Sequence, residues 1–279
     1  MSESTSQAAQ SRLESRRHAS YDPAMTATNR YPSLHGRNVF VTGGASGIGA
    51  AIVTGFAAQG ARVAFVDVAE AAAAALAEAV AAAGHPTPWW QRCDVRDVAA
   101  LQAAMASAAA ALGDFHVLVN NVASDDRHTL ESVEPAYYDE RVAINQRAAF
   151  FALQAVVPGM RRLGGGAVIN LGSTGWQTKS ADYPVYAVAK SAVNGLTRGT
   201  AMRLGRHGIR INTVSPGWVM TERQKQLWLT PEGEAEIDRH QCLPDRLQPQ
   251  DVAAMVLFLA SDDARMCTAQ EFIVDGGWT

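Results

Sequence analysis

The stretch Asn38-Val39-Phe40-Val41-Thr42-Gly43-Gly44-Ala45-Ser46-Gly47-Ile48-Gly49 decides the fold of this chain. Residues 38–42 form a short apolar and β-branched run, which is typical of a strand buried on both faces. Glycines then allow a tight turn, and a helical pattern follows from Ile48 to Gln59. This order of strand, turn and helix predicts a phosphate-binding loop, because a helix N-terminus presents free N–H groups and partial positive charge.

The same alternation of apolar runs and helical stretches continues to the C-terminus. Strands are expected at residues 38–42, 62–66, 89–93, 115–120, 167–171, 209–214 and 271–274. Helices are expected at residues 48–59, 70–83, 98–112, 142–163, 183–205 and 249–260. Strands that alternate with helices pair in parallel through right-handed crossovers. The pattern therefore predicts a Rossmann-type α/β fold, a doubly wound parallel sheet of seven strands with helices on both faces.

We expect a single domain at residues 31–279. Residues 1–30 are rich in Ser, Ala, Thr and Arg and have no apolar period, which is typical of a disordered tail. Because the globular pattern begins only at Tyr31, Met25 is a second candidate for the start of translation. Residues 218–247 are polar and irregular and are expected to form a mobile flap.

The charge balance excludes two classes of partner. The 279 residues contain 24 Lys and Arg and 27 Asp and Glu, so the chain lacks the basic excess that favours nucleic acid or an anionic membrane surface. No apolar run approaches the roughly 18 residues that span a bilayer. The three cysteines have no CxxC spacing and the seven histidines no paired ligand spacing. We therefore expect no disulfide, no metal site and a cytoplasmic protein.

Asp67 follows the second expected strand, 18 residues beyond Gly49. A carboxylate at this place accepts hydrogen bonds from the hydroxyls of an adenosine ribose and repels a 2′-phosphate. No Lys or Arg lies in the glycine loop or directly after Asp67. The sequence therefore favours NAD over NADP.

Motifs beyond the glycine loop complete the pattern of a known family. They are Asp94-Val95, Asn120-Asn121-Val122-Ala123, Asn145, Ser173, Tyr186-Ala187-Val188-Ala189-Lys190, Asn212, Pro216-Gly217 and Asp275-Gly276-Gly277. As a set and in this order, over residues 34–279, they resemble the short-chain dehydrogenase/reductase family. The chain departs from the family at Val122-Ala123, where Ala-Gly is usual. The added methyl is expected to narrow the cofactor pocket.

The resemblance implies a nicotinamide cofactor in a cleft at the ends of the strands. The expected cofactor contacts are Gly43, Ser46, Gly47, Ile48, Gly49, Asp67, Asp94, Val95, Asn121, Tyr186, Lys190, Pro216, Gly217, Val219 and Thr221. It also implies the catalytic set Asn145, Ser173, Tyr186 and Lys190.

Tyr186 and Lys190 are four residues apart on an expected helix and so share a face. A nearby ammonium favours the phenolate, which predicts a lowered pKa for Tyr186 and a role as the base that takes a hydroxyl proton while hydride leaves. Ser173 would hold the reacting oxygen. From the resemblance, Asn145 would kink its helix and fix a water that links Lys190 to solvent.

The segments that shape the substrate pocket in this family are polar and aromatic here. Aromatic faces ringed by polar groups suit a sugar. The segments also resemble bacterial aldose 1-dehydrogenases of the D-xylose, D-galactose or L-arabinose type, which oxidise the anomeric hydroxyl of a cyclic sugar to a lactone. The expected substrate contacts are Asp125, Arg127, His128, Ser173, Trp176, Gln177, Arg223 and Gln224. For Arg127 and His128, a salt-linked surface loop is an equal alternative, and the sequence does not specify the aldose.

Two other functions stay open at this stage. One is a reductase of ketones or 3-oxoacyl thioesters, which would favour NADPH and an apolar pocket. The other is a non-catalytic cofactor-binding protein. The family also implies a homotetramer or dimer that packs the two long helices and the C-terminal strand.

Overall fold

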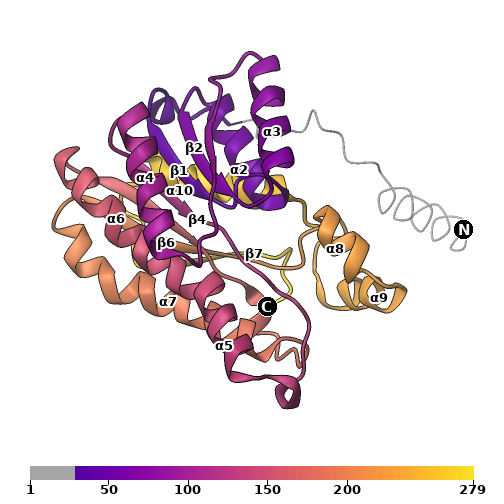
Figure 1. Ribbon diagram of the computed structural model, residues 1–279. Helices are drawn as coiled ribbons and strands as arrows, with labels where there is room; N and C mark the ends of the chain where they lie inside the picture. Colours follow the sequence, from indigo (N-terminus) through magenta and orange to yellow (C-terminus); the bar gives the residue numbers. More distant parts are fainter. Residues whose placement is uncertain (1–28) are drawn as a thin grey trace, which may run out of the picture.

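The computed structural model describes residues 29–279 (Figure 1). The predicted tail, except for Asn29 and Arg30, and the alternative start at Met25 lie outside the described residues. A sheet of seven parallel strands forms the centre of the molecule, in the order β3-β2-β1-β4-β5-β6-β7. The predicted fold is thereby confirmed. The strands are β1 Asn38–Thr42, β2 Arg62–Asp67, β3 Trp89–Arg92, β4 Val117–Asn120, β5 Gly166–Leu171, β6 Ile209–Pro216 and β7 Glu271–Val274.

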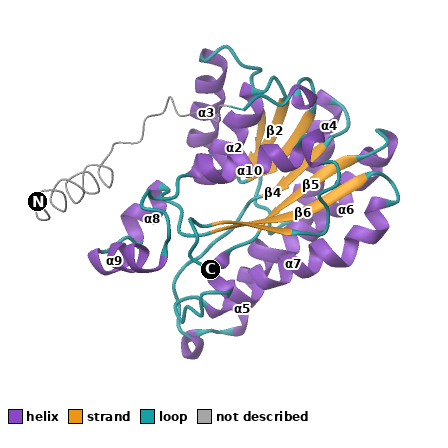
Figure 2. Cartoon of the chain, turned by 180° about the vertical axis from the view of Figure 1, so that it is seen from behind, coloured by secondary structure: helices purple, strands orange, loops and turns teal. Residues whose placement is uncertain are grey.

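Helices cover both faces of the sheet (Figures 1 and 2). One face packs against α2 Gly47–Ala58, α3 Glu70–Ala82 and α10 Pro249–Ala260, and the other against α4 Val98–Leu112, α6 Ala148–Arg162 and α7 Pro184–Gly205. The two cores alternate along each strand, because successive side chains of a strand point to opposite faces. In β1, Val39 and Val41 lie in the first core and Phe40 lies in the second.

A chain of buried polar groups joins α7 to the sheet. The Asn120 amide of β4 donates to Asn170 Oδ1 of β5 at 2.8 Å, and the Asn170 amide donates to Thr197 Oγ1 of α7 at 2.9 Å. The Thr197 hydroxyl also bonds Thr213 of β6 at 2.8 Å. These hydrogen bonds form away from water, so the chain favours one placement of α7 on the sheet.

The predicted helix at residues 142–163 is longer and less regular than expected. It begins with α5 Pro135–Val142, passes through a π-helical turn at Ala143–Arg147 and continues as α6. Pro135 takes the first helical position, where its missing N–H costs nothing. Short 3₁₀ turns complete the structure at Pro32–Leu34, Leu130–Ser132, Thr174–Trp176 and Asp262–Ala264.

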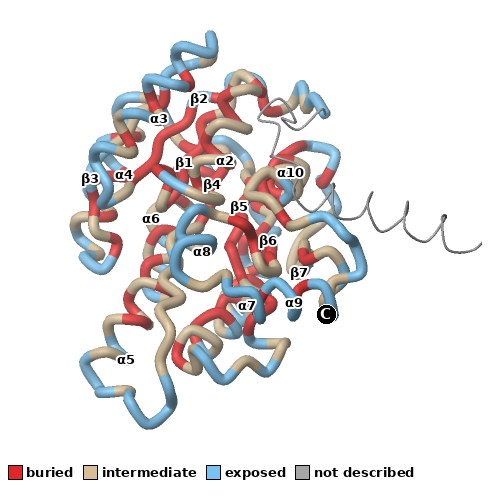
Figure 3. Tube along the Cα trace, turned by 90° about the vertical axis from the view of Figure 1, so that its right-hand side faces the viewer, coloured by how far each residue is buried: buried red, intermediate tan, exposed pale blue. Residues whose placement is uncertain are grey.

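The prediction that residues 218–247 are irregular is wrong. Two helices lie there, α8 Glu222–Leu227 and α9 Pro231–His240, and they project beside the sheet with mainly exposed residues (Figure 3). Thr221 and Thr230 cap them, since their hydroxyls accept from the backbone N–H groups of Gln224 and Gly233 at 3.2 Å each. Helices of six and ten residues leave too short a periodic pattern to be recognised.

None of the helices within residues 29–279 combines the length and the hydropathy that crossing a bilayer would require.

Candidate active site

A cleft of about 1190 Å³ opens at the carboxyl ends of the strands. Its glycine loop follows β1 and its other wall follows β4, the neighbouring strands at which the strand order reverses. Ligands of doubly wound sheets bind at this kind of switch point. Every residue expected to bind the cofactor lines the cleft: Gly43, Ser46, Gly47, Ile48, Gly49, Asp67, Asp94, Val95, Asn121, Tyr186, Lys190, Pro216, Gly217, Val219 and Thr221.

The glycine loop is shaped to bring backbone close to a ligand. Gly43 and Gly47 have backbone φ angles of +70° and +53°, which residues other than glycine rarely adopt. A Cβ on Gly49 would lie 1.8 Å from the Gly43 carbonyl oxygen. Ser46 precedes α2 without capping it through its side chain, so the first N–H groups of this helix are left for a phosphate.

Asp67 lies at the end of β2, facing the glycine loop. Its Oδ2 accepts from the Ala45 N–H and its Oδ1 from the Ala69 N–H, both at 3.0 Å. Each carboxylate oxygen keeps a further lone pair, so Asp67 remains able to accept from ribose hydroxyls. The Asn121 amide ties the other wall to the loop, donating to the Gly43 carbonyl at 2.8 Å.

Asp94 lines the cleft beyond β3 and binds an arginine. Arg96 Nε donates to Asp94 Oδ1 at 3.0 Å and to Oδ2 at 2.9 Å, and Nη2 donates to Oδ2 at 2.5 Å. The Arg96 guanidinium also contacts Glu140. The hydrogen bonds from Arg96 hold the pKa of Asp94 below its usual value. Since two carboxylates already occupy Arg96, it is not a free cation for a 2′-phosphate.

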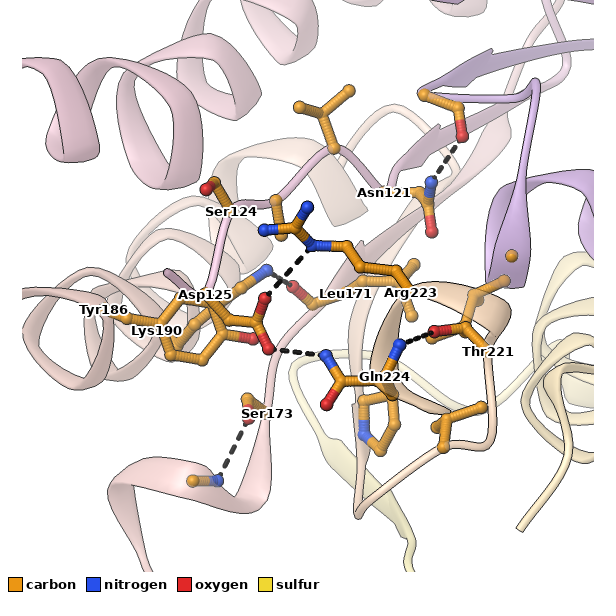
Figure 4. Close-up of a pocket in the computed structure, with 18 of the residues that line it drawn as sticks. Asn121, Ser124, Asp125, Leu171, Ser173, Tyr186, Lys190, Thr221, Arg223 and Gln224 are labelled. Carbon is orange, nitrogen blue, oxygen red and sulfur yellow. Dashed lines mark hydrogen bonds and ion pairs between the residues drawn. The ribbon is translucent and has the colours of Figure 1, made fainter. Parts of the chain in front are cut away.

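Lys190 is 2% exposed, and its ammonium donates to the Leu171 carbonyl at 2.7 Å (Figure 4). Burial lowers the pKa of Lys190 to about 8, opposed by the negative charge of Asp125. Its Nζ lies 5.7 Å from the centre of the Tyr186 ring. The buried ammonium is thus close to the phenol, as their spacing of four residues on α7 requires.

The pKa of Tyr186 is raised above its ordinary value, chiefly by burial and further by Asp125 and Tyr183. A hydrogen bond with Ser173 and the positive charge of Arg127 oppose this shift. The expected lowering of the Tyr186 pKa is therefore wrong for the protein alone, because desolvation of the phenolate outweighs the opposing effects of Ser173 and Arg127.

Asn145 lies in the π-helical turn between α5 and α6, as its expected kink requires. Its amide donates to the carbonyls of Ser124 and Arg141 at 3.0 Å each, and its Oδ1 accepts from the Ser124 N–H at 2.9 Å. Asn145 and Lys190 also line a cavity of about 10 Å³, roughly the room that one water molecule needs.

The substrate side of the cleft is polar. Asp125 lies beside Tyr186 and accepts a 2.7 Å hydrogen bond from the Gln224 amide of α8 (Figure 4). Arg223 Nε lies 3.8 Å from Asp125 Oδ1. The Arg127 guanidinium stacks 4.3 Å from the centre of the Tyr183 ring. Of the residues expected to contact substrate, Asp125, Arg127, Ser173, Arg223 and Gln224 line the cleft.

Three other residues expected to contact substrate do not line the cleft: His128, Trp176 and Gln177. The Gln177 amide donates instead to Glu271 of β7 at 3.2 Å, and Trp176 is largely exposed. A 3₁₀ turn at residues 174–176 follows Ser173, whose hydroxyl caps it by accepting from the Gly175 N–H. The ring of His128 makes hydrogen bonds within the protein.

The site residues expected from the sequence leave out three aromatic residues of the cleft, Tyr183, Trp218 and Trp278. Tyr183 lies three residues before Tyr186, and this spacing alone would have placed it beside the catalytic candidate. Arg141 was also missed; its side chain is 10% exposed and donates to Asp126 at 2.7 Å. Within residues 29–279, no group of three or more His, Cys, Asp or Glu is arranged to hold a metal ion.

Comparison with known proteins gives a consistent picture. A family model described as enoyl-(acyl carrier protein) reductase matches residues 43–279. D-xylose 1-dehydrogenase of Caulobacter vibrioides is 49% identical over 248 residues, which cover 89% of this chain and 98% of the relative. A probable galactose dehydrogenase of Rhizobium meliloti is 46% identical over 250 residues, 90% of this chain and 98% of the relative.

Two solved structures have the same fold. A short-chain dehydrogenase/reductase from Serratia marcescens has a TM-score of 0.83 and 34% identity, covering 88% of this chain and 99% of that one. A 7α-hydroxysteroid dehydrogenase complexed with NADH and 7-oxo glycochenodeoxycholic acid has a TM-score of 0.85 and 30% identity, covering 89% of this chain and 96% of that one.

Proposed function

This chain belongs to the short-chain dehydrogenase/reductase family, and from that premise we propose that it oxidises a cyclic aldose at the anomeric hydroxyl to the aldonolactone, with NAD as the hydride acceptor. One observation carries the proposal. Ser173, Tyr186 and Lys190 meet in a cleft that also contains a phosphate-type glycine loop and a ring of polar side chains. The named sugar dehydrogenases among its relatives support the choice of an aldose.

The residues of the cleft fit a dinucleotide. The glycine loop and the N-terminus of α2 suit its pyrophosphate, and Asp67 suits the adenosine ribose, which favours NAD over NADP. When bound, the cofactor supplies the hydride acceptor. The other expected cofactor contacts, which lie between Asp94 and Thr221 in the sequence, would hold the remaining parts of the dinucleotide.

Tyr186, Ser173 and Lys190 carry the proton chemistry. Ser173 is close enough to Tyr186 to lower its pKa, so the two hydroxyl groups can share one reacting oxygen of the substrate. The raised pKa of Tyr186 makes it a phenol in the protein alone, so the reaction needs added positive charge near the ring before Tyr186 can accept a proton. The cavity between Lys190 and Asn145 gives one water room to carry that proton onward.

Asp125, Arg127 and Gln224 are the groups that we propose to recognise the sugar. A cyclic aldose offers several neighbouring hydroxyls, each able to donate to a carboxylate or accept from a guanidinium. Asp125 supplies an acceptor and Arg127 a donor, both near enough to Tyr186 to affect its pKa. Helices α8 and α9 of residues 218–247 would then close over the sugar as the flap of a single domain, residues 31–279, with Arg223 at the rim.

The test is a panel of aldoses with NAD or NADP, followed by absorbance of the reduced cofactor. We expect one or two aldoses to reduce NAD rapidly, Tyr186→Phe to abolish turnover, and the exposed Tyr138→Phe to leave it unchanged. If no aldose reacts and the enzyme instead reduces ketones or 3-oxoacyl thioesters with NADPH, the sugar proposal is wrong. No turnover with either panel would favour a non-catalytic cofactor-binding protein.

We also propose that the protein assembles as a homotetramer or dimer. The exposed large apolar side chains of the described residues include Phe150 of α6, Val188 and Met202 of α7, and Ile273 of the edge strand β7. An assembly would bury them. A monomer in light scattering would contradict this proposal. The three thiols, Cys93, Cys242 and Cys267, are free, and we propose the cytoplasm as a compartment that suits them.

A further inference from the structure

The loop after β4 has two sides. Asp125 and Arg127 line the cleft, whereas Asp126 and His128 do not. Asp126 pairs with Arg141 and Arg223. His128 makes contacts to three separate segments of the protein: its own loop, α5 and the start of α7.

The first of these contacts reaches the helix that bears Tyr186. The backbone N–H of Val185, the second residue of α7, donates to Nε2 of His128 at 3.1 Å. The residue before the helix, Tyr183, makes no side-chain cap, and Pro184 has no N–H. The first turn of a helix leaves N–H groups without partners inside the helix. His128 therefore supplies the cap of α7 from 57 residues earlier in the sequence.

The contacts of the ring together fix the imidazole in one tautomer. Nε2 accepts from Val185, so it carries no proton and Nδ1 carries one. Nδ1 then donates to the Asp126 carbonyl at 2.9 Å, and the hydroxyl oxygen of Tyr137 in α5 lies 3.0 Å from Nδ1. The His128 N–H donates to the Asp182 carbonyl at 2.8 Å. The ring is thus held on both edges, and the Tyr137 ring packs against it at 5.0 Å between centres.

We propose that His128 is a positioning residue: it caps α7 and links the loop that carries Asp125 and Arg127 to the helix that carries Tyr186. Tyr186 follows the capped residue directly, so the cap determines where the phenol lies relative to Ser173 and to the sugar contacts. A displacement of about 1 Å at a reacting group can cost on the order of 100-fold in rate. The kinetic part of this inference rests on the proposed sugar dehydrogenase activity, whereas the structural part does not.

Two amide variants separate the cap from the other contacts. In His128→Gln, the amide oxygen can reach the position of Nε2 and accept from Val185. In His128→Asn, the shorter amide reaches only the position of Nδ1, so Asp126 keeps a donor and Val185 loses its acceptor. His207→Asn is the matched control, because His207 is exposed in the turn that follows α7.

Two measurements are made on each variant. Amide hydrogen exchange of the peptide that contains Val185 needs no substrate; we expect it to be roughly tenfold faster in His128→Asn and near wild type in His128→Gln. In sugar oxidation we expect kcat to fall roughly 10- to 100-fold in His128→Asn, to stay within about threefold in His128→Gln, and the KM for NAD to stay unchanged. The KM for NAD and a cooperative thermal transition show that each variant is folded.

Equal exchange in wild type and His128→Asn would overturn the cap. A raised sugar KM with unchanged kcat in both variants would make His128 a sugar contact instead. If the wild type oxidises no aldose, the proposed function is wrong. The cap is still tested in that case, because the exchange measurement needs no substrate. Should His128→Asn not fold, His128→Gln decides the cap, because it removes both Nδ1 contacts and keeps an acceptor for Val185; the proposal expects normal exchange there, and fast exchange would refute it.

Discussion

Replacing Lys190 with methionine should make the protein more stable while it removes activity. The ammonium is 2% exposed and donates a hydrogen bond to the Leu171 carbonyl. Lowering the pKa from 10.5 to about 8 corresponds to about 3 kcal/mol of unfavourable free energy for the charged form in the folded protein. Methionine removes this penalty but also the hydrogen bond to Leu171, worth about 1 kcal/mol. We therefore expect Lys190→Met to raise the free energy of unfolding at pH 7 by about 2 kcal/mol.

The gain should depend on pH in a defined direction. The folded protein holds the Lys190 proton less tightly than the unfolded chain does, so the penalty is fully present below pH 8. It disappears as the pH rises toward 10.5, the ordinary value of lysine. The stability advantage of Lys190→Met should shrink across this window, and at its upper end only the lost hydrogen bond should remain.

The assay is urea unfolding of wild type and variant at matched protein concentration, at several pH values from 7 to 10.5, without cofactor. Lys225→Met is the control; this lysine is exposed and pairs with Glu222 at 2.9 Å, and we expect a change within about 0.5 kcal/mol. A variant less stable than wild type at pH 7, or an advantage that stays constant to pH 10.5, would refute the reasoning.

Three further changes test other parts of the cleft and its support. Gly49→Ala places a methyl 1.8 Å from the Gly43 carbonyl oxygen, so NADH binding measured by fluorescence should weaken by about tenfold or more. Unchanged binding would contradict the close contact between residue 49 and the loop carbonyl. Asp67→Ser should lower kcat/KM for NAD roughly 10- to 100-fold while NADP loses little, and equal losses with both would dismiss its role at the ribose. Thr197→Val leaves the buried amide of Asn170 without its acceptor and should cost about 1–3 kcal/mol in urea unfolding, against little change for Thr200→Val; equal costs would contradict the buried chain.

The strands and the glycine loop could be predicted from the sequence because their physical requirements are local. Val39, Phe40 and Val41 are apolar on both faces, and only a strand with helices on both sides buries them all. Gly49 has no room for a side chain, so the loop has a recognisable spacing. The same holds for Tyr186 and Lys190, whose separation by one helical turn already places them together.

The directions of loop side chains could not be predicted in this way. Asp125 and His128 are three residues apart in one polar segment, yet one lines the cleft and the other caps α7. Their difference depends on Val185 and Tyr137, which are distant in sequence. The pKa of Tyr186 is a similar case, because the degree of burial that determines it is a property of the folded protein and not of residue spacing.

The order of the segments around the cleft has a consequence for how the protein is made. The glycine loop and Asp67 belong to the first strands, whereas Tyr186, Lys190 and the helices over the cleft follow β5. During synthesis, the surface proposed for the adenosine half of a dinucleotide leaves the ribosome well before the groups proposed to transfer the proton. A nascent chain would therefore expose the proposed nucleotide-binding loop before the proposed catalytic groups, and the cleft is complete only when β6 and β7 have joined the far edge of the sheet.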